Sequence, residues 1–424
     1  MAGKLDPKQY VRVLRVRKAW RFDLGGLLMR IFAYMSSLGL IAMLTLSGWS
    51  YFRAGTVVSV MAVAVFLISP RICKLIDEHG QSKIVPVAVG IQMCGLALMI
   101  AIVQLGGPWQ LCYLGAFLVG FTPNPMALVR ARWSYLVETG LLGSEAPDIR
   151  TVFTYEGVLD DSGYMIGPAV SLALASLVAP CAGMIFGGVC FITGCALLLS
   201  SRDTEPTVGW QAAGDETGST ANGAEKNTES GRGQRSMFVV SSMVRILFAM
   251  MLFQGLIYGV YNTSLVAFGQ ERGASGVISL ILASTSVGSI AAGLFFGMAR
   301  FKCSLARQLA GCAVAFGALY MLLFFASDMV SLAVICFAAS FSYAPLLICM
   351  NTSCEQSVPG SRLTESLAWM NAGATLGTTV APSLGGVFVD NYGALAGLNF
   401  SAAVAACMII FTALFWRVIK REIG

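Results

Sequence analysis

Charged residues are scarce in this sequence. Only 12% of its 424 residues are Asp, Glu, Lys or Arg, whereas soluble domains contain about 25%. Hydrophobic residues make up 56%, and the mean hydropathy is +0.74. A protein of this size cannot cover its surface with so few charges, so a water-soluble fold is excluded and much of the surface must face hydrocarbon. The composition therefore indicates an integral membrane protein.

Histidine, closely spaced cysteines and phosphate-binding motifs are also rare or missing. A histidine-based catalytic or metal site would have to be built on His79, the only histidine. The 12 cysteines include no Cys-x-x-Cys pair, which argues against metal or redox chemistry. The chain has no Gly-x-x-x-x-Gly-Lys-Ser/Thr run, which argues against an ATP-driven pump. We therefore expect no catalytic residues, no metal and no cofactor, and we do not expect an enzyme.

Twelve apolar stretches approach the roughly 20 residues that a helix needs to cross a bilayer. They lie at 27–46, 54–72, 84–104, 109–129, 156–178, 182–201, 238–260, 276–299, 306–327, 330–350, 365–389 and 395–416. Residues 202–237 lie between the two sets of six and are rich in Gly, Ser, Thr, Glu and Asn, which cannot build a packed core. The sequence thus predicts an all-α membrane protein with twelve transmembrane helices.

This pattern divides the chain into successive parts. We expect a basic cytoplasmic or interfacial segment at 1–26, a six-helix bundle at 27–201, a disordered cytoplasmic linker at 202–237, a second six-helix bundle at 238–417 and a cytoplasmic tail at 418–424. Within the first part, residues 8–22 alternate basic with apolar side chains. That alternation is typical of a short interfacial helix, but it is equally consistent with a simple topology signal.

The basic residues predict the orientation. The expected loops on one face carry every Lys and Arg except Arg53 and Arg272, and loops rich in Lys and Arg remain in the cytoplasm. We therefore expect both termini on the cytoplasmic side of the plasma (inner) membrane. The net charge of +6 then reflects orientation and attraction to the anionic lipid surface rather than nucleic-acid binding.

The two halves contain a weak internal repeat. Gly163-x-x-x-Gly167 in the fifth stretch corresponds to Gly373-x-x-x-Gly377 in the eleventh at an offset of 210 residues, and Glu156 corresponds to Glu365 at an offset of 209. The fourth and tenth stretches each carry prolines in mid-membrane. Such a repeat predicts two similar bundles related by an axis along the membrane normal, with the substrate path between them.

Two motifs resemble those of the major facilitator superfamily. The loop after the second stretch resembles the superfamily signature Gly-x-Leu-x-Asp-Arg-x-Gly-Arg-Arg at Leu75, Asp77 and Gly80, and Lys83 offers a nearby cation. It departs from the signature at Cys73, Glu78, Gln81 and Ser82. The run Gly163-x-x-x-Gly167-Pro168 is similar to the superfamily's antiporter motif, and the run 128–133 resembles bacterial drug and metabolite exporters. The resemblance implies alternating access and a gating role for Asp77, Gly80 and Lys83.

Charges close to or inside the membrane are the first functional candidates, because their burial is costly. Glu156 lies at the cytoplasmic entrance of the fifth stretch, with Asp160 and Asp161 one turn deeper, while Arg130 and Arg132 end the fourth stretch at the same surface. These residues could form a salt-bridge cluster that closes an inner gate. Alternatively, Asp160 or Asp161 is the site of proton coupling, and adjacent residues on a helix point about 100° apart, so only one of the two would face the interior comfortably.

The resemblance also implies that the first, fourth, seventh and tenth spans line a substrate cavity. Their polar and aromatic candidates are Tyr34, Ser37, Asn124, Gln254, Tyr258, Tyr261, Asn262 and Tyr343. Such a lining, without an acidic side chain in mid-membrane, suits a large and mainly apolar ligand. The alternative for any single Tyr in this set is ordinary helix packing.

The sequence therefore favours a secondary transporter that exports a small amphipathic or hydrophobic compound in exchange for protons, acting as a monomer in the lipid bilayer. Uptake or facilitated diffusion of a polar nutrient, such as a sugar or an amino acid, is the alternative transport reaction. A membrane receptor or scaffold that retains the fold without transport is the alternative of another class.

Overall fold

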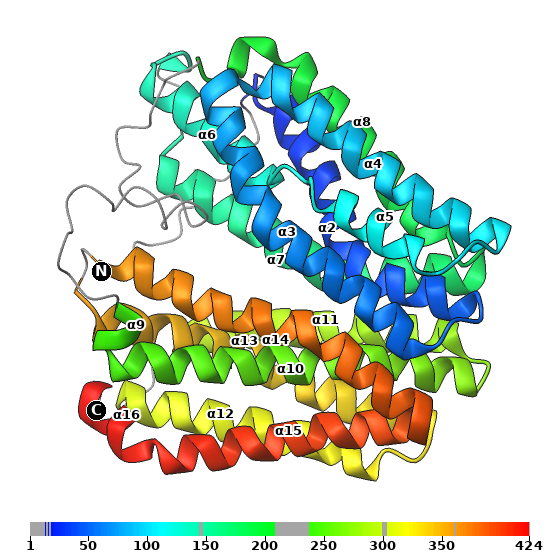
Figure 1. Cartoon of the computed structure of the whole chain (residues 1–424). Coiled ribbons are helices and arrows are strands. Elements are labelled where there is room, and N and C mark those ends of the chain that lie inside the picture. Colours follow the sequence, from blue (N-terminus) through cyan, green and yellow to red (C-terminus); the bar gives the residue numbers. More distant parts are fainter. Residues whose placement is uncertain are drawn as a thin grey trace. The chain divides into compact units, whose positions relative to one another are not determined.

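The structure, a computed structural model, describes residues 13, 16, 18–143, 147–207, 237–298, 303–359 and 362–423. Within these ranges the chain consists of helices joined by short connections (Figure 1). The expected linker at 202–237 falls mostly on residues 208–236, outside the described residues. The expected interfacial helix at 8–22 begins in a segment, 8–12, that also lies outside them.

The first half of the chain forms α2 (Trp20–Leu46), α3 (Tyr51–His79), α4 (Gln81–Leu105), α5 (Leu111–Val119), α6 (Pro125–Glu138), α7 (Ile149–Leu177) and α8 (Ala182–Ser200), followed by the short η2 (Arg202–Thr204). The second half forms α9 (Met237–Val240), α10 (Ser242–Glu271), α11 (Ser275–Met298), α12 (Leu305–Met321), η3 (Leu322–Phe325), α13 (Met329–Ser357), α14 (Leu363–Tyr392), α15 (Ala394–Leu414) and α16 (Trp416–Ile423).

Among the described residues, 10 helices are long and apolar enough to cross a membrane. The other two expected spans correspond to the pair α5 and α6 and to α7, whose apolar part is Ile166–Leu177. The prediction of an all-α membrane protein with twelve transmembrane helices in two sets of six is therefore confirmed.

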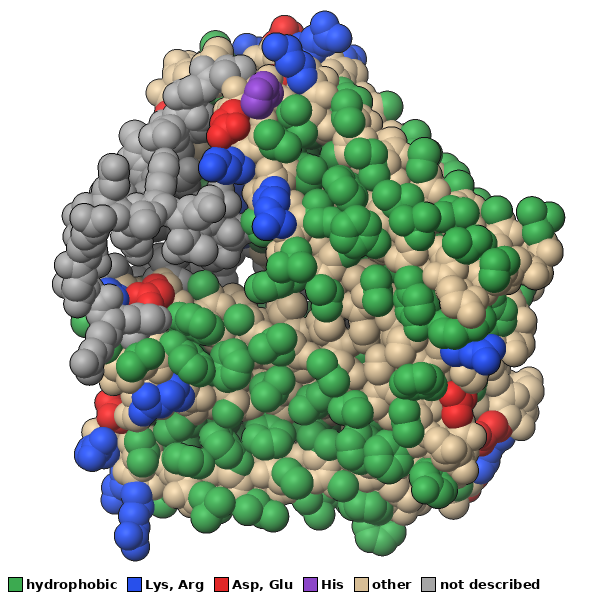
Figure 2. Space-filling view, viewed as in Figure 1, with side chains coloured by type: hydrophobic (Ala, Val, Ile, Leu, Met, Phe, Trp, Pro, Cys, Tyr) green, Lys and Arg blue, Asp and Glu red, His purple; other side chains and the backbone are tan. Residues whose placement is uncertain are grey.

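The surface has the apolar character that a membrane requires. Large hydrophobic side chains remain exposed on helices of both halves, including Phe66 at 57%, Phe295 at 70% and Leu414 at 74%. Figure 2 shows hydrophobic side chains spread over the visible face, with charged side chains mostly near its margins. Hydrophobic side chains exposed over a whole face are compatible with lipid and not with water.

The helices extend beyond the apolar stretches that predict them. The expected loop at 73–83 is helical except at Gly80. α3 continues to His79, and α4 begins at Gln81. Gly80 forms the turn with a φ of 94°, a conformation that favours glycine. A helix that leaves the hydrocarbon continues to satisfy its own backbone hydrogen bonds, so apolar length underestimates helix length.

The fourth span is broken rather than continuous. α5 ends at Val119, and α6 begins at Pro125 after the Asn124 side chain accepts hydrogen bonds from the backbone N–H groups of Met126 at 3.1 Å and Ala127 at 3.3 Å. Pro125 suits the first position of a helix, where no N–H partner is needed. Because α6 continues to Glu138, the expectation that this span ends near 129 is wrong, and Arg130 and Arg132 lie inside a helix.

Glycines allow close helix packing at equivalent places in both halves. A side chain at Gly163 or Gly167 of α7 would overlap Tyr34 of α2. A side chain at Gly373 or Gly377 of α14 would overlap the backbone of α10, at Phe248 and Leu252 respectively. The first and fifth spans of each set of six thus approach through a Gly-x-x-x-Gly pair, which is a packing motif of membrane helices.

The chain forms two compact units, one comprising Met1–Met43 and Val60–Gly218 and the other Leu44–Ser59 and Ser219–Gly424. The end of α2 and the beginning of α3 therefore group with the second half of the chain. The division into bundles at 27–201 and 238–417 assigns this segment to the first half and remains a prediction.

Candidate functional site

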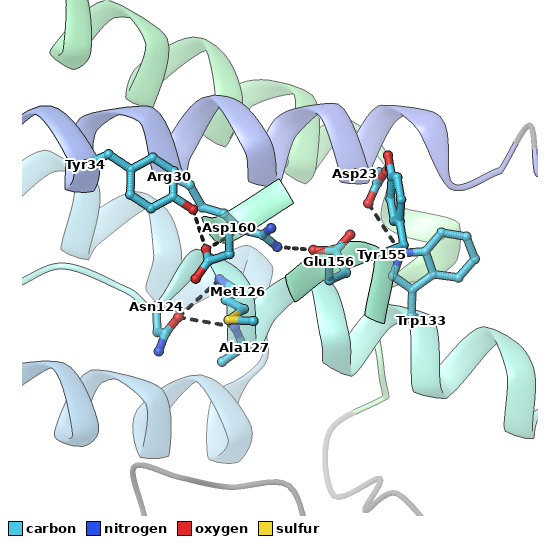
Figure 3. Close-up of polar contacts among 10 residues, drawn as sticks. All are labelled: Asp23, Arg30, Tyr34, Asn124, Met126, Ala127, Trp133, Tyr155, Glu156 and Asp160. Carbon is cyan, nitrogen blue, oxygen red and sulfur yellow. Dashed lines mark hydrogen bonds and ion pairs between the residues drawn. The ribbon is translucent and has the colours of Figure 1, made fainter. Parts of the chain in front are cut away.

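A buried ion pair joins α2 to α7. The Arg30 side chain is 3% exposed and its Nη2 donates to Oε2 of Glu156, whose side chain is 1% exposed (Figure 3). Arg30 counted among the basic loop residues in the orientation argument, and that placement is wrong. α2 begins at Trp20, so Arg30 lies in its third turn and faces the interior of the first unit.

Asp160 lies one turn further along α7 and shares the same cation. Its Oδ1 accepts a hydrogen bond from the Tyr34 hydroxyl, and Arg30 Nε is 3.9 Å from that oxygen. The Asp160 side chain is 34% exposed, so it is the more accessible of the two carboxylates. The Arg30 guanidinium therefore interacts with both the buried carboxylate of Glu156 and the more exposed carboxylate of Asp160.

Asp23 is a third carboxylate of this site. Its Oδ1 accepts from the indole Nε1 of Trp133 at 3.4 Å, and its Oδ2 accepts from the Tyr155 hydroxyl at 3.3 Å. The Asp23 carboxyl also interacts directly with that of Glu156. No N–H or O–H group in the described residues donates to Glu156 Oε1. Two neighbouring carboxyl groups repel each other when both are ionised and attract each other when they share one proton.

Arg130 of α6 is the fifth charged residue of this site among the described side chains. Its guanidinium lies over the Phe153 ring, 5.2 Å from the centroid, and interacts electrostatically with Glu156, Arg30 and Asp160. We call Asp23, Arg30, Arg130, Glu156 and Asp160 the charge cluster. It contains three carboxyl groups and two guanidinium groups, so its net charge is −3 + 2 = −1 when every member is ionised.

Arg132 does not belong to the charge cluster. It is fully buried, and its Nε donates to Gln81 Oε1 at 2.8 Å while its Nη1 donates to the Ser201 carbonyl at 2.7 Å and to Thr204 Oγ1 at 2.9 Å. Arg132 therefore takes no part in a salt-bridge cluster with Glu156 in this structure, and its gating role remains a prediction. Residues 130 and 132 point to different sides of α6 because they are two positions apart, so only one of them can face α7.

The signature-like segment has partners of its own. Gln81 holds Arg132, and the backbone N–H of Ser82 donates to Glu205 Oε1 at 2.8 Å. Both residues stand where the superfamily signature has a basic pair, so the departures are accommodated inside the first unit. Asp77 and Lys83 lie on the exposed surface at the end of α3 and the start of α4. Their gating role remains a prediction.

The structure separates the expected cavity residues into groups. Tyr34 contributes to the charge cluster, Asn124 caps α6, and Ser37 is exposed on α2. In the second unit the Tyr258 and Tyr343 rings meet at 5.7 Å, whereas Tyr261 packs against Tyr320 at 5.6 Å. Tyr261 is thus a core residue. The side chain of Asp161 lies outside the described residues, while Gly163, Gly167 and Pro168 lie in α7, where the two glycines contact Tyr34.

Sequence reasoning missed Asp23, Arg30, Tyr155 and Trp133. Asp23 falls in the expected N-terminal segment at 1–26, and the orientation argument counts Arg30 among the basic residues of the cytoplasmic loops. A signal was nevertheless present, since Asp23, Arg30 and Tyr34 are spaced by seven and four residues and therefore share one helical face.

Several solved transporter structures are similar to this chain. Residues 247–423 match the model of the Major Facilitator Superfamily, and no curated protein matches the chain. The nucleoside transporter NupG shares 13% identity at a TM-score of 0.70, covering 96% of this chain and 100% of that one. A bacterial homologue of the iron transporter ferroportin, in an inward-facing state, shares 15% at 0.67, with coverages of 95% and 99%. An autoinhibited POT family peptide transporter shares 12% at 0.63, with coverages of 96% and 97%.

These structures share the fold of this chain, and the sequence of its second half matches the family directly. The predicted resemblance is therefore confirmed. Residues 247–423 thus match the Major Facilitator Superfamily in sequence, and the whole chain has the fold of solved membrane transporters.

Proposed function

We propose that this transporter exports a small amphipathic or hydrophobic compound in exchange for protons, and that the charge cluster is its proton-binding site. The observation that carries the proposal is the excess of three buried or half-buried carboxyl groups over two guanidinium groups. One bound proton brings the cluster from −1 to zero. Because an uncompensated charge inside a membrane protein is costly, the neutral, protonated form is the stable one away from water.

Glu156 is the member best suited to exchange that proton. It is nearly inaccessible, it adjoins Asp23, and it shares Arg30 with Asp160. Proton binding at Glu156 weakens its attraction for Arg30 and leaves the guanidinium to Asp160, the more exposed carboxylate. Loss of the proton reverses this preference. Arg30 can thus pair mainly with Glu156 or mainly with Asp160, and proton binding shifts the equilibrium between these two arrangements. Coupling of transport to protons requires such a shift.

The remaining parts of the proposal rest on sequence. The motif formed by Gly163, Gly167 and Pro168 supports exchange of the substrate for protons. The aromatic residues of α10 and α13 support an amphipathic substrate. The basic loops support cytoplasmic termini in the plasma (inner) membrane. We further propose that the protein acts as a monomer, with no nucleic-acid partner. The named structural relatives are a nucleoside transporter, a homologue of an iron transporter and a peptide transporter, so they differ too much to identify the substrate of this protein.

Transport in proteoliposomes tests the coupling. Radiolabelled neutral amphipathic aromatic compounds should be transported faster when the proton gradient drives protons across the membrane in the opposite direction. Glu156→Gln should remove that acceleration. Glu365→Gln is the matched control. Glu365 lies within one residue of the corresponding position in the second half of the chain, and its substitution should leave the acceleration intact. Transport that ignores the proton gradient in the wild type would contradict the proposal. Counterflow of glucose or alanine without transport of amphipathic compounds would instead favour nutrient uptake.

A further inference from the structure

Gln254 is a buried amide without a partner. It lies near the middle of α10, is 4% exposed, and neither its Nε2 nor its Oε1 has a hydrogen-bond partner among the described residues. Buried polar atoms almost always have hydrogen-bond partners, because an unsatisfied donor or acceptor loses its hydration without compensation. A side chain with both kinds of atom unsatisfied therefore needs an explanation.

Tyr258 and Asn262 follow Gln254 at intervals of four residues and share its face of α10. The Asn262 side chain is hydrogen-bonded to the Tyr258 hydroxyl, and its Oδ1 has no partner in the described part of the chain. The Asn262 amide group is therefore the donor in that hydrogen bond. We call Gln254, Tyr258 and Asn262 the amide face. It offers one complete amide and one further carbonyl oxygen.

Aromatic rings border the amide face on one side. The Tyr258 ring is 5.7 Å from that of Tyr343 on α13, with 45° between their planes. Tyr258 and Tyr343 are only partly buried, whereas Phe316 is fully buried and Tyr320 is 4% exposed. The pair thus lies at the edge of an aromatic core, with ring surface still available for stacking.

The two helices that carry the amide face and its aromatic border have no charged residue at this level. No Asp, Glu, Lys, Arg or His occurs in 246–270 of α10 or in 329–354 of α13. A charged ligand would lose its hydration here without gaining a counter-charge, which is unfavourable in a membrane interior. The ligand suited to this face is therefore neutral.

A primary amide presents an N–H donor and a C=O acceptor side by side. Its best complement is a group with an acceptor and a donor in the same arrangement, which forms two parallel hydrogen bonds, as amide side chains do with base edges. We propose that the amide face binds a neutral, planar heteroaromatic compound whose ring edge carries a C=O group next to an N–H group. The inference rests on the proposed function, because it names the substrate class of the transporter.

Calorimetric titration of the purified full-length protein in detergent tests this inference without any proton gradient. The probes are 2-quinolone, which has the N–H and C=O edge, 1-methyl-2-quinolone, which lacks the donor, and quinoline, which lacks the carbonyl. We expect 2-quinolone to bind roughly tenfold to a hundredfold more tightly than either analogue, since an analogue leaves a buried amide atom unpaired. Equal affinities for the three probes, or no binding of 2-quinolone, would overturn the inference.

Gln254→Met should abolish the preference for 2-quinolone while keeping the volume of the side chain. Gln92→Met is the matched control, because Gln92 is also a buried glutamine of a spanning helix, at 1% exposure, and its Oε1 is also without a partner among the described residues. Gln254→Asn retains the amide with a shorter reach, so it serves if the Met variant fails to fold. It should weaken 2-quinolone binding at least fivefold. A preference that survives Gln254→Met, or 2-quinolone binding that is unchanged in Gln254→Asn, would contradict the assignment.

The outcomes also separate this inference from the proposed function. If 2-quinolone binds selectively but the transport rate does not depend on the proton gradient, proton coupling is refuted and the assignment of the amide face stands. Proton-driven transport of amphipathic compounds by a protein with no preference among the three probes would refute the amide face and leave the coupling in place.

Discussion

Arg30 and Glu156 form an ion pair that is almost completely enclosed between α2 and α7, with side chains 3% and 1% exposed. Such a pair gains little over two apolar side chains of similar volume, because both ions lose their hydration. A buried ion pair in a protein that has few charges is therefore explained better by function than by stability.

The ion pair gives a prediction about stability. Arg30→Met should lower the free energy of unfolding by about 3–5 kcal/mol, because it leaves buried carboxylates without their cation. Combining it with Glu156→Gln should recover much of the loss, since the second substitution removes an unpaired charge. Thermal unfolding in detergent measures both effects, and Arg245→Met, at an exposed residue of α10, is the control. Additive losses in the double variant would contradict the pairing.

Close packing of α7 on α2 gives a second prediction. Gly163→Ala should lower the free energy of unfolding by about 1–3 kcal/mol, because the new methyl group overlaps the Tyr34 ring. Gly157→Ala on the same helix has nothing within 4 Å of the new methyl group. It should stabilise α7 by about 0.5–1 kcal/mol through helix propensity alone. Unfolding midpoints that move in the same direction for both variants would argue against this packing.

Asp390 gives a third prediction, because it caps a helix distant in sequence. Its carboxylate accepts hydrogen bonds from the backbone N–H groups of Tyr51 at 2.8 Å and Phe52 at 2.7 Å, at the start of α3. Asp390→Ala should therefore cost about 0.5–2 kcal/mol, the usual value of a helix N-cap, whereas Asp390→Asn keeps an acceptor and should cost less. Hydrogen exchange of the first turn of α3 reports the loss directly. Unchanged exchange at Tyr51 and Phe52 in Asp390→Ala would show that the cap is not formed.

The number of spans and the internal repeat could be predicted from sequence because both depend on local patterns. Apolar length specifies a spanning helix, and the Gly163 and Gly373 pairs mark equivalent packing positions. The ends of helices could not be predicted in this way. α2 begins at Trp20 although its apolar stretch begins near Leu27, because a helix continues to satisfy its own backbone hydrogen bonds outside the hydrocarbon.

The candidate site could be predicted only in part, because its contacts join different helices. Glu156 and Asp160 stood out as acids near a membrane interior, but the sequence could not show that Arg30 rather than Arg132 approaches them. That choice depends on how α2, α6 and α7 turn toward each other. The unpaired amide of Gln254 could not be predicted at all, because a hydrogen bond that is missing is a property of the packed structure.

The most direct test of the central claim is the infrared spectrum of the purified protein, which distinguishes a protonated carboxyl group from a carboxylate. The wild-type protein should show a protonated carboxyl group at neutral pH, because its charge cluster holds three acids against two cations. Glu156→Gln should lose this signal, since two acids then balance two cations, and Glu365→Gln should retain it. The same carboxyl signal in the wild type and in Glu156→Gln would contradict the account.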